Sequence, residues 1–283
     1  MLHKSLASSS LAARAAVAGA ALAMLASGLA AQSARASLLV YEPFNYTSGS
    51  TLNGQTATGT GLTGTWGGSN TGTISAGSLS EGNLATADNS YLSGGGNNTI
   101  SFVSNITATT GNPVWGSFLL NTPSNVASNY GGLVLEPAAP TSSAPAPFIG
   151  ISNSGHFLVQ KYGSSDNTVL GTAASANTTY LLVFEDIANA TSGGPDTLNL
   201  WVNPTAGAAN PPATPDVSNT YSTSPIGAIS GIDLANGGGF SYDEVRIGTT
   251  YADVTPAVPE PATLGLVAIG AMGLLLLKRR RIA

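Results

Sequence analysis

Short segments in which apolar and polar residues alternate recur through the central part of the chain. Nine of them are rich in β-branched and aromatic residues and are bounded by Gly, Pro, Asn and Ser, a composition typical of β-strands. They span residues 37–41, 100–103, 114–120, 132–136, 147–152, 156–162, 179–186, 197–203 and 240–248. Since no sustained helical periodicity occurs between them, the pattern predicts an all-β fold, an antiparallel β-sandwich.

Turn residues separate these segments. The N-S-G sequence at residues 153–155 predicts a tight hairpin turn between two strands. Residues 137–147 and 204–215, each bounded by proline, predict long surface loops because strands resume after both. Residues 47–96 are so rich in Gly, Ser, Thr and Asn that the pattern leaves the positions of any strands there open.

The first 36 residues have the pattern of a secretory signal peptide. Two early cations precede an apolar stretch of small residues at 15–31, and Ala34-Arg35-Ala36 then offers an A-x-A cleavage site. We therefore expect export through the Sec translocon and cleavage by signal peptidase, with Ser37 as the first mature residue. The alternative, an uncleaved membrane helix, is disfavoured because the stretch is short, alanine-rich and followed by a good cleavage site.

The C-terminal end combines three features in a fixed order. The tetrapeptide Val258-Pro259-Glu260-Pro261 precedes an apolar run at residues 262–277, which stops at Lys278-Arg279-Arg280-Arg281. A helix of that length spans roughly 24 Å against a hydrocarbon core of about 30 Å, and bilayer thinning with snorkelling basic ends can close the gap. The four cations should stay in the cytoplasm, which places the central part of the chain outside.

This order resembles the PEP-CTERM sorting signal of bacterial surface proteins, with which residues 258–281 agree throughout. In that family exosortase, an integral-membrane cysteine protease, acts near the Pro-Glu-Pro tripeptide. The resemblance implies exosortase as a partner, and an inner-membrane intermediate on the way to the cell surface or extracellular matrix of a Gram-negative-type bacterium. The alternative is an ordinary C-terminal membrane anchor preceded by a proline-rich hinge.

The chain thus divides into a signal peptide at 1–36, an exported domain at 37–255 and a sorting signal with its transmembrane helix and basic tail at 256–283. Between residues 37 and 257 there are thirteen acids and two cations, a net charge of −11. Such a charge repels phosphate backbones and excludes nucleic acid as a partner. The sequence has no cysteine, which excludes disulfides, thiolate nucleophiles and thiolate metal sites.

Five segments of the exported domain follow a family pattern. They are Y-E-P-F at 41–44, W-G-S-F-L-L at 115–120, T-Y-L-L-V-F at 179–184, D-T-L-N-L-W-V-N-P at 196–204 and Y-D-E-V-R-I-G at 242–248. Together they resemble the laminin-G-like, concanavalin-A-like jelly rolls, which implies a jelly-roll sandwich. Because these segments mark strands and carry no chemistry, the resemblance implies no activity.

Two adjacent acidic pairs, Glu185-Asp186 and Asp243-Glu244, raise the question of glycoside hydrolysis, which uses two carboxyl groups around one bond. Neighbours in a strand point to opposite faces, so neither pair is expected to supply both groups. The E-x-D-x-x-E or E-x-D-x-E strand of hydrolases with the concanavalin-A-like fold is absent, and we predict no catalytic residue. No cofactor and no metal ligand is predicted. A calcium site, which needs only oxygen ligands, stays open as an alternative, but no D-x-[DN]-x-[DN]-G loop supports it.

The segment 197–203 places Asn199, Trp201 and Asn203 on one face of a strand. An aromatic ring flanked by amides is typical of sugar-binding faces, but we favour the interpretation that Trp201 packs beneath the 204–215 loop or in the core. The sequence as a whole predicts an exported, exosortase-sorted cell-surface or matrix protein with a non-catalytic sandwich domain. The alternatives are a carbohydrate-binding module for exopolysaccharide and a glycoside hydrolase.

Overall fold

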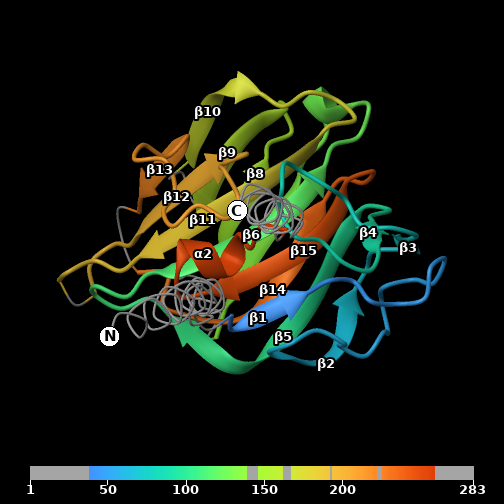
Figure 1. Ribbon diagram of the computed structural model, residues 1–283, viewed down its shortest axis with the longest axis horizontal. Coiled ribbons are helices and arrows are strands. Elements are labelled where there is room, and N and C mark those ends of the chain that lie inside the picture. Colours follow the sequence, from blue (N-terminus) through green and yellow to red (C-terminus); the bar gives the residue numbers. More distant parts are fainter. Residues whose placement is uncertain (1–37, 139–145, 162–166, 192, 222–224, 259–283) are drawn as a thin grey trace, which may run out of the picture. The chain divides into compact units, whose positions relative to one another are not determined.

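The computed structural model describes residues 38–138, 146–161, 167–191, 193–221 and 225–258, which form two antiparallel sheets packed face to face (Figure 1). The predicted antiparallel β-sandwich is confirmed. The signal-peptide helix and the transmembrane helix predicted to flank it lie outside the described residues. Among the described helices, none combines the length and the hydrophobicity that crossing a membrane requires.

Sheet I contains eight strands. Its hydrogen-bonded order is β13 (Val217–Thr220), β12 (Thr197–Val202), β11 (Thr179–Ile187), β6 (Val114–Asn121), β15 (Ser241–Gly248), β4 (Ser90–Leu92) and β3 (Thr73–Ser75), and β1 (Val40–Glu42) pairs with β15 beside that path. The first and last strands of the domain are therefore neighbours.

Sheet II contains seven strands. Its order is β10 (Asn167–Ala173), β9 (His156–Lys161), β8 (Pro147–Ile151), β7 (Gly131–Pro137), β14 (Ala228–Asn236), β5 (Gly96–Thr107) and β2 (Leu62–Gly68). The predicted N-S-G turn joins β8 to β9, where Gly155 has a φ of 76° that L-residues rarely adopt.

The main hydrophobic core lies between the two sheets and is built by alternate residues of each strand. In β6, Phe118 and Leu120 face this core, whereas Trp115 and Leu119 face away from it. Side chains that face away form two smaller apolar clusters, one on the outer face of each sheet. The central strands are buried on both faces, which explains why β6 and β11 are hydrophobic almost throughout.

All nine predicted segments overlap observed strands, and six strands go beyond the prediction: β2, β3, β4, β10, β13 and β14. Three of these lie within or next to the Gly-rich residues 47–96, and β3 and β4 have only three residues each. Such strands exist because a neighbour supplies the hydrogen bonds and the burial, not because of their own propensity. The largest omission is β14, which occupies a central position in sheet II.

Two short helical turns complete the fold, η1 (Val126–Ser128) and α2 (Tyr251–Val254). The α2 turn follows β15 and begins with a capping box, in which Thr250 and Asp253 exchange side-chain and backbone hydrogen bonds. It contacts β6 and β15. The chain thus returns across the outer face of sheet I before it reaches the predicted sorting signal.

Candidate functional site

The outer face of sheet I is covered by other parts of the chain. The Trp115 ring stacks on the Trp201 ring with 5.5 Å between centroids, and it meets the Tyr251 ring edge-on at 5.7 Å. Tyr251 belongs to α2, which lies over this sheet in Figure 1. Because these three rings are buried, none of them offers a flat surface on which a ligand could stack.

Of the predicted ligand residues, Asn199 and Trp201 lie on this face, and Asn203 follows the end of β12 and is exposed. Trp201 is 4% exposed, and its Nε1 donates a hydrogen bond of 3.0 Å to the carbonyl of Pro212, within the loop predicted to cover it. Asn199 bonds a neighbouring carboxylate and a serine hydroxyl. The side-chain oxygen of Asn203 accepts the N–H of Leu181 at 2.8 Å. All three side chains therefore have partners within the domain.

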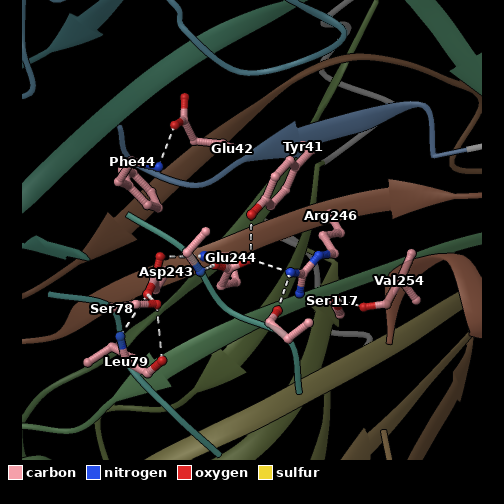
Figure 2. A network of polar contacts seen from close by, with 12 residues as sticks. Tyr41, Glu42, Phe44, Ser78, Leu79, Ser117, Asp243, Glu244, Arg246 and Val254 are labelled. Atoms are coloured by element: carbon pink, nitrogen blue, oxygen red, sulfur yellow. Dashed lines mark hydrogen bonds and ion pairs between the residues drawn. The ribbon is translucent and has the colours of Figure 1, made fainter. Parts of the chain in front are cut away.

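A polar network on β15 is the second feature of sheet I (Figure 2). A β-bulge between Asp243 and Arg246 inserts an extra residue, and Glu244 has a φ of 54°. Figure 2 shows the Asp243 and Glu244 side chains close together, on the same side of the sheet. The expectation that these sequence neighbours point to opposite faces is wrong, because the bulge breaks the alternation.

Both carboxylates bind one irregular segment, residues 78–87. We call it the tail-binding segment, because it also binds residues 256–258 at the end of the described chain. Asp243 accepts hydrogen bonds from the Ser78 hydroxyl and from the N–H of Leu79, the latter at 2.7 Å. Glu244 accepts one from the N–H of Ala87. Burial raises the pKa of Asp243 to about 8. The two acids therefore fix this segment on the sheet, and neither side chain is exposed to solvent.

Arg246 completes the network as a buried cation. It forms an ion pair with Glu244, donates to the carbonyl of Ala85 at 2.6 Å and lies over the Tyr41 ring, 5.0 Å from its centroid. The Tyr41 hydroxyl also donates to Glu244 at 2.9 Å. A buried ion pair with these additional partners is a structural element, and removal of either charge would leave the other uncompensated.

The side chains of Glu185 and Asp186 do point to opposite faces of the sheet, as expected for neighbours in a strand. Glu185 faces outward and accepts a hydrogen bond from Asn199 at 3.1 Å, whereas Asp186 faces the core and is fully buried. Neither carboxyl oxygen of Asp186 has a hydrogen-bond partner in the described part of the chain. Burial, with the charges of Asp196 and Glu185, raises the pKa of Asp186 to about 8, so it is mainly neutral at pH 7.

The outer face of sheet II is different, because two carboxyl groups from separate strands converge on it. In the pairing of β14 with β7, Asp233 lies opposite Val134 and Gly231 lies opposite Glu136. Asp233 and Glu136 are therefore diagonal neighbours on one face, a relation that separates residues by about 7–8 Å. Gly231 lets β5 approach closely here, because a side-chain carbon at residue 231 would lie only 2.4 Å from the carbonyl oxygen of Ile100.

The two acids differ in environment. Asp233 is 3% exposed and accepts a hydrogen bond on Oδ2 from the amide of Asn97, while its Oδ1 has no partner among the described residues. Burial, reinforced by the charge of Glu136, raises the pKa of Asp233 to about 6. Glu136 is half-buried, and burial also raises its pKa. Asp233 therefore exchanges its proton near pH 6, in the range where a carboxyl group can act as a general acid.

Polar and aromatic side chains surround these acids on the same face. Along β5, Asn97 and Ser101 are exposed. The half-buried ring of Tyr130 meets the Phe148 ring edge-on at 6.4 Å, and Phe148 lies beside Val134 in the neighbouring strand. The half-buried Gln160 lies opposite Phe148. This face therefore offers hydrogen-bond acceptors, amide donors and an accessible ring edge within a few strand widths.

A separate pocket of about 470 Å³ opens where β5 ends, beside the start of β1 and the residue after β15. No residue that lines this pocket has a titratable side chain. The lining consists of Leu39, Val40, Gly61, Val103, Ser104, Asn105, Ile106, Thr107, Asn112, Pro113, Val114 and Thr249. Among the described residues, no three His, Cys, Asp or Glu side chains gather closely enough to hold a metal ion.

Sequence reasoning missed the Glu136–Asp233 pair. The two residues are far apart in sequence, and Asp233 lies on β14, the strand that the prediction omits. The available signal was the I-D-L-A alternation at residues 232–235, which puts the Asp233 side chain on the outer face of a strand whose other face carries the core residues Ile232 and Leu234. Nothing in the sequence indicates that β14 pairs with β7, and this pairing is what brings the acids together.

Comparison with protein families identifies a PEP-CTERM protein-sorting motif at residues 257–281. This motif implies export, sorting to the cell surface and exosortase as the processing partner. Of the predicted processing residues, Val258 is described and exposed, whereas Ala34, Ala36, Ser37, Pro259, Glu260, Pro261 and the four terminal cations lie outside the described residues. No curated protein matches the chain.

Several solved structures similar to this chain are carbohydrate-active or carbohydrate-binding proteins. An endo-β-1,4-glucuronan lyase from Trichoderma reesei is 14% identical, with a TM-score of 0.47 over 74% of this chain and 99% of that chain. An endo-1,3-β-glucanase from Streptomyces sioyaensis is 11% identical, with a TM-score of 0.46 over 75% and 95%. The carbohydrate-binding module CBM66 from Bacillus subtilis is 11% identical, with a TM-score of 0.36 over 59% and 92%.

These similarities correct one prediction. The sequence led to the expectation that the exported domain is not an enzyme, but the similar structures include a lyase and a glucanase. The expectation also relied on the absence of convergent carboxyl groups, and Glu136 and Asp233 supply such a pair. The exclusion of catalysis is therefore wrong, although the similarities assign no activity to this chain.

Proposed function

We propose that the protein is an exported, exosortase-sorted surface or matrix protein whose domain binds carbohydrate on the outer face of sheet II. The observation that carries this proposal is the convergence of Glu136 and Asp233 beside Asn97, with the accessible Tyr130 ring on the same face. Sugar hydroxyls donate to carboxylates and accept from amides, and a ring edge gives apolar contact to the sugar.

The charge of the domain favours a neutral glycan over a polyuronate. Binding a chain of carboxylates requires cations, and residues 37–257 contain only Lys161 and Arg246 among thirteen acids. Arg246 is buried and bound to Glu244 on the other sheet. A neutral exopolysaccharide is not repelled by a domain with a net charge of −11, whereas a polyanion is.

Binding of the exported domain to a panel of neutral and uronate-rich polysaccharides tests this proposal. We expect retention on at least one neutral polysaccharide, and a loss of about tenfold or more in affinity when Tyr130 is replaced by Ala. Asn199→Ala, on the covered face, serves as the matched control and should leave binding unchanged. Retention that is insensitive to Tyr130→Ala, or that prefers polyuronates, would contradict the assignment of this face.

A second candidate function is glycoside hydrolysis by the same pair of acids. Diagonal neighbours in a sheet lie about 7–8 Å apart at the backbone. Carboxyl groups on such residues can reach the separation of about 6.5–9.5 Å that inverting glycosidases use, in which one carboxyl group protonates the leaving oxygen and the other activates water. Asp233, which is buried and holds its proton to about pH 6, suits the acid role. The more exposed Glu136 can bind a water molecule and suits the base role.

Reducing-sugar release from the bound polysaccharide distinguishes the two functions. If the pair is catalytic, Glu136→Gln and Asp233→Asn should each lower the rate by at least about a hundredfold while the affinity changes little. Product analysis by NMR should then show inversion at the anomeric carbon. Binding with no sugar release by the unchanged protein would leave the carbohydrate-binding function and reject hydrolysis.

The route to the surface is part of this proposal. We infer that residues 1–36 are removed as a signal peptide between Ala36 and Ser37, and that residues 37–255 form the exported domain. The apolar run at 262–277 would then hold the chain in the inner membrane of a Gram-negative-type bacterium until exosortase acts near Pro259-Glu260-Pro261. N-terminal sequencing of the exported form should give Ser37, and a start upstream of residue 28 would reject the signal peptide.

A further inference from the structure

The last described residues, 255–258, are bound to the domain, and we call them the tail. The N–H of Val258 donates to the carbonyl of Asn83 at 2.9 Å, and the N–H of Ala85 donates to the carbonyl of Pro256 at 2.8 Å. These are the bonds of an antiparallel bridge to the tail-binding segment. The tail is therefore held by a single β-bridge and its two hydrogen bonds up to the residue before Pro259.

Two other contacts hold the tail from its opposite side. The N–H of Gly207 donates to the carbonyl of Thr255 at 2.7 Å. Gly207 has a φ of 78°, and a side-chain carbon added there would lie only 2.6 Å from the side chain of Ala257. Glycine is thus required at residue 207 for the tail to approach this closely.

The buried network of Figure 2 supports the tail through the tail-binding segment. Ala85 uses both backbone groups, since its carbonyl accepts from Arg246 and its N–H donates to Pro256 in the tail. Asp243 and Glu244 bind the two ends of the same segment. The otherwise unexplained buried ion pair therefore has a role, because it fixes the strand to which the tail is bound.

This arrangement leaves little chain between the domain and the membrane. Only Pro259, Glu260 and Pro261 separate Val258 from the apolar run that begins at residue 262. Four Cα steps span at most about 14 Å. A protease takes the residues on both sides of its cut in extended form, usually with hydrogen bonds to the substrate backbone. With the tail bound, those on the domain side are already paired with residues 83–85.

We propose that the bound tail is an autoinhibitory contact, which must open before exosortase can cleave near Pro259-Glu260-Pro261. Opening frees residues 256–258 and about doubles the length of chain between the folded domain and the membrane. The proposal rests on the sorting function and is independent of the carbohydrate-binding face. It places the rate of processing under the control of the interaction between the tail and residues 83–85.

The test is the rate of cleavage of the full chain in an exosortase-bearing host, followed by pulse-chase. Leu84→Ala removes a buried side chain next to Ala257, and we expect cleavage about fivefold faster because the open tail is more populated. Leu79→Ala, in the same segment and packed against the same apolar cluster but without a bond to the tail, is the matched control. Thermal unfolding of each exported domain shows whether it still folds.

A second change bypasses the tail without altering the domain. A flexible Gly-Ser segment followed by a second copy of Ala-Val is inserted after Val258, so that the original tail stays bound and the tripeptide keeps its neighbours. This chain should also be cleaved faster, and Leu84→Ala should then give no further increase. Equal or slower cleavage after either change would overturn the proposal.

The unchanged chain and a chain with alanine at Pro259, Glu260 and Pro261 complete the design. Cleavage of the first and not of the second establishes the sorting function on which the proposal rests. If neither is cleaved, the sorting function fails and the proposal falls with it. If both behave as expected but the tail changes have no effect, only the autoinhibitory contact is rejected.

Discussion

The two outer faces of the sandwich differ in how far other parts of the chain cover them. On sheet I, α2, the tail-binding segment and the loop that contains Pro212 cover Trp115 and Trp201, and the polar groups are bound to one another. On sheet II, polar side chains along β5, β7 and β9 keep part of their surface exposed, and a buried acid has an oxygen without a partner in the described chain.

This difference shows that residue type alone does not identify a ligand-binding face. The Asn-Trp-Asn pattern on β12 has the composition of a sugar-binding face, yet its ring is buried and its amides are used. The outer face of sheet II carries a Tyr and two acids that no sequence pattern groups together. The faces differ because α2, the tail-binding segment and the loop that contains Pro212 cover the rings of sheet I.

The largest expected effect is the difference in unfolding free energy lost when an aromatic ring is removed from each outer face. Trp115→Ala removes a buried ring that contacts both Trp201 and Tyr251, and we expect the free energy of unfolding to fall by about 3–5 kcal/mol. Tyr130→Ala removes a half-buried ring on sheet II and should lower it by only about 1 kcal/mol. Urea denaturation of the exported domain measures both, and similar losses would refute the distinction between the faces.

The sequence predicts the sandwich because its nine segments combine alternation with β-branched and aromatic residues, which fixes strand and face together. It does not predict sites that depend on pairing across the sheet. Glu136 and Asp233 converge only through the register of β7 with β14. Asp243 and Glu244 share a side only because of a bulge, a one-residue irregularity with no sequence signature here.

An effect of intermediate size is the pH dependence of the unfolding free energy, to which buried acids contribute more than accessible ones. Burial raises the pKa of Glu42 to about 7 and that of Asp186 to about 8, so the folded state favours their protonated forms. Their contribution to stability is complete below about pH 4 and is lost as pH rises towards 8. We therefore expect the unfolding free energy to be higher at pH 5 than at pH 8.5.

Asp186→Asn isolates one of the two largest contributions to this pH dependence, since burial raises the pKa of Asp243 to about 8 as well. The carboxyl group faces the core with Asp196 and Glu185 nearby, and an amide there carries no charge at any pH. The variant should be more stable than the unchanged domain at pH 8.5 by at least about 2 kcal/mol, and the slope of stability between pH 5 and 8 should flatten. A slope that is unaffected would show that Asp186 does not titrate in this range.

The smallest expected effect on stability is that of Glu136→Gln, and it is the sharpest test of the open face. Glu136 is half-buried, no side-chain hydrogen bond joins it to another described residue, and the amide has the same shape, so unfolding free energy should change by less than about 0.5 kcal/mol. Removing its charge should lower the pKa of Asp233, because the two charges repel. NMR titration of the Asp233 carboxyl carbon measures that shift. If the pKa of Asp233 stays near 6, the two carboxyl groups do not interact, and the proposal that Glu136 and Asp233 form one site is rejected.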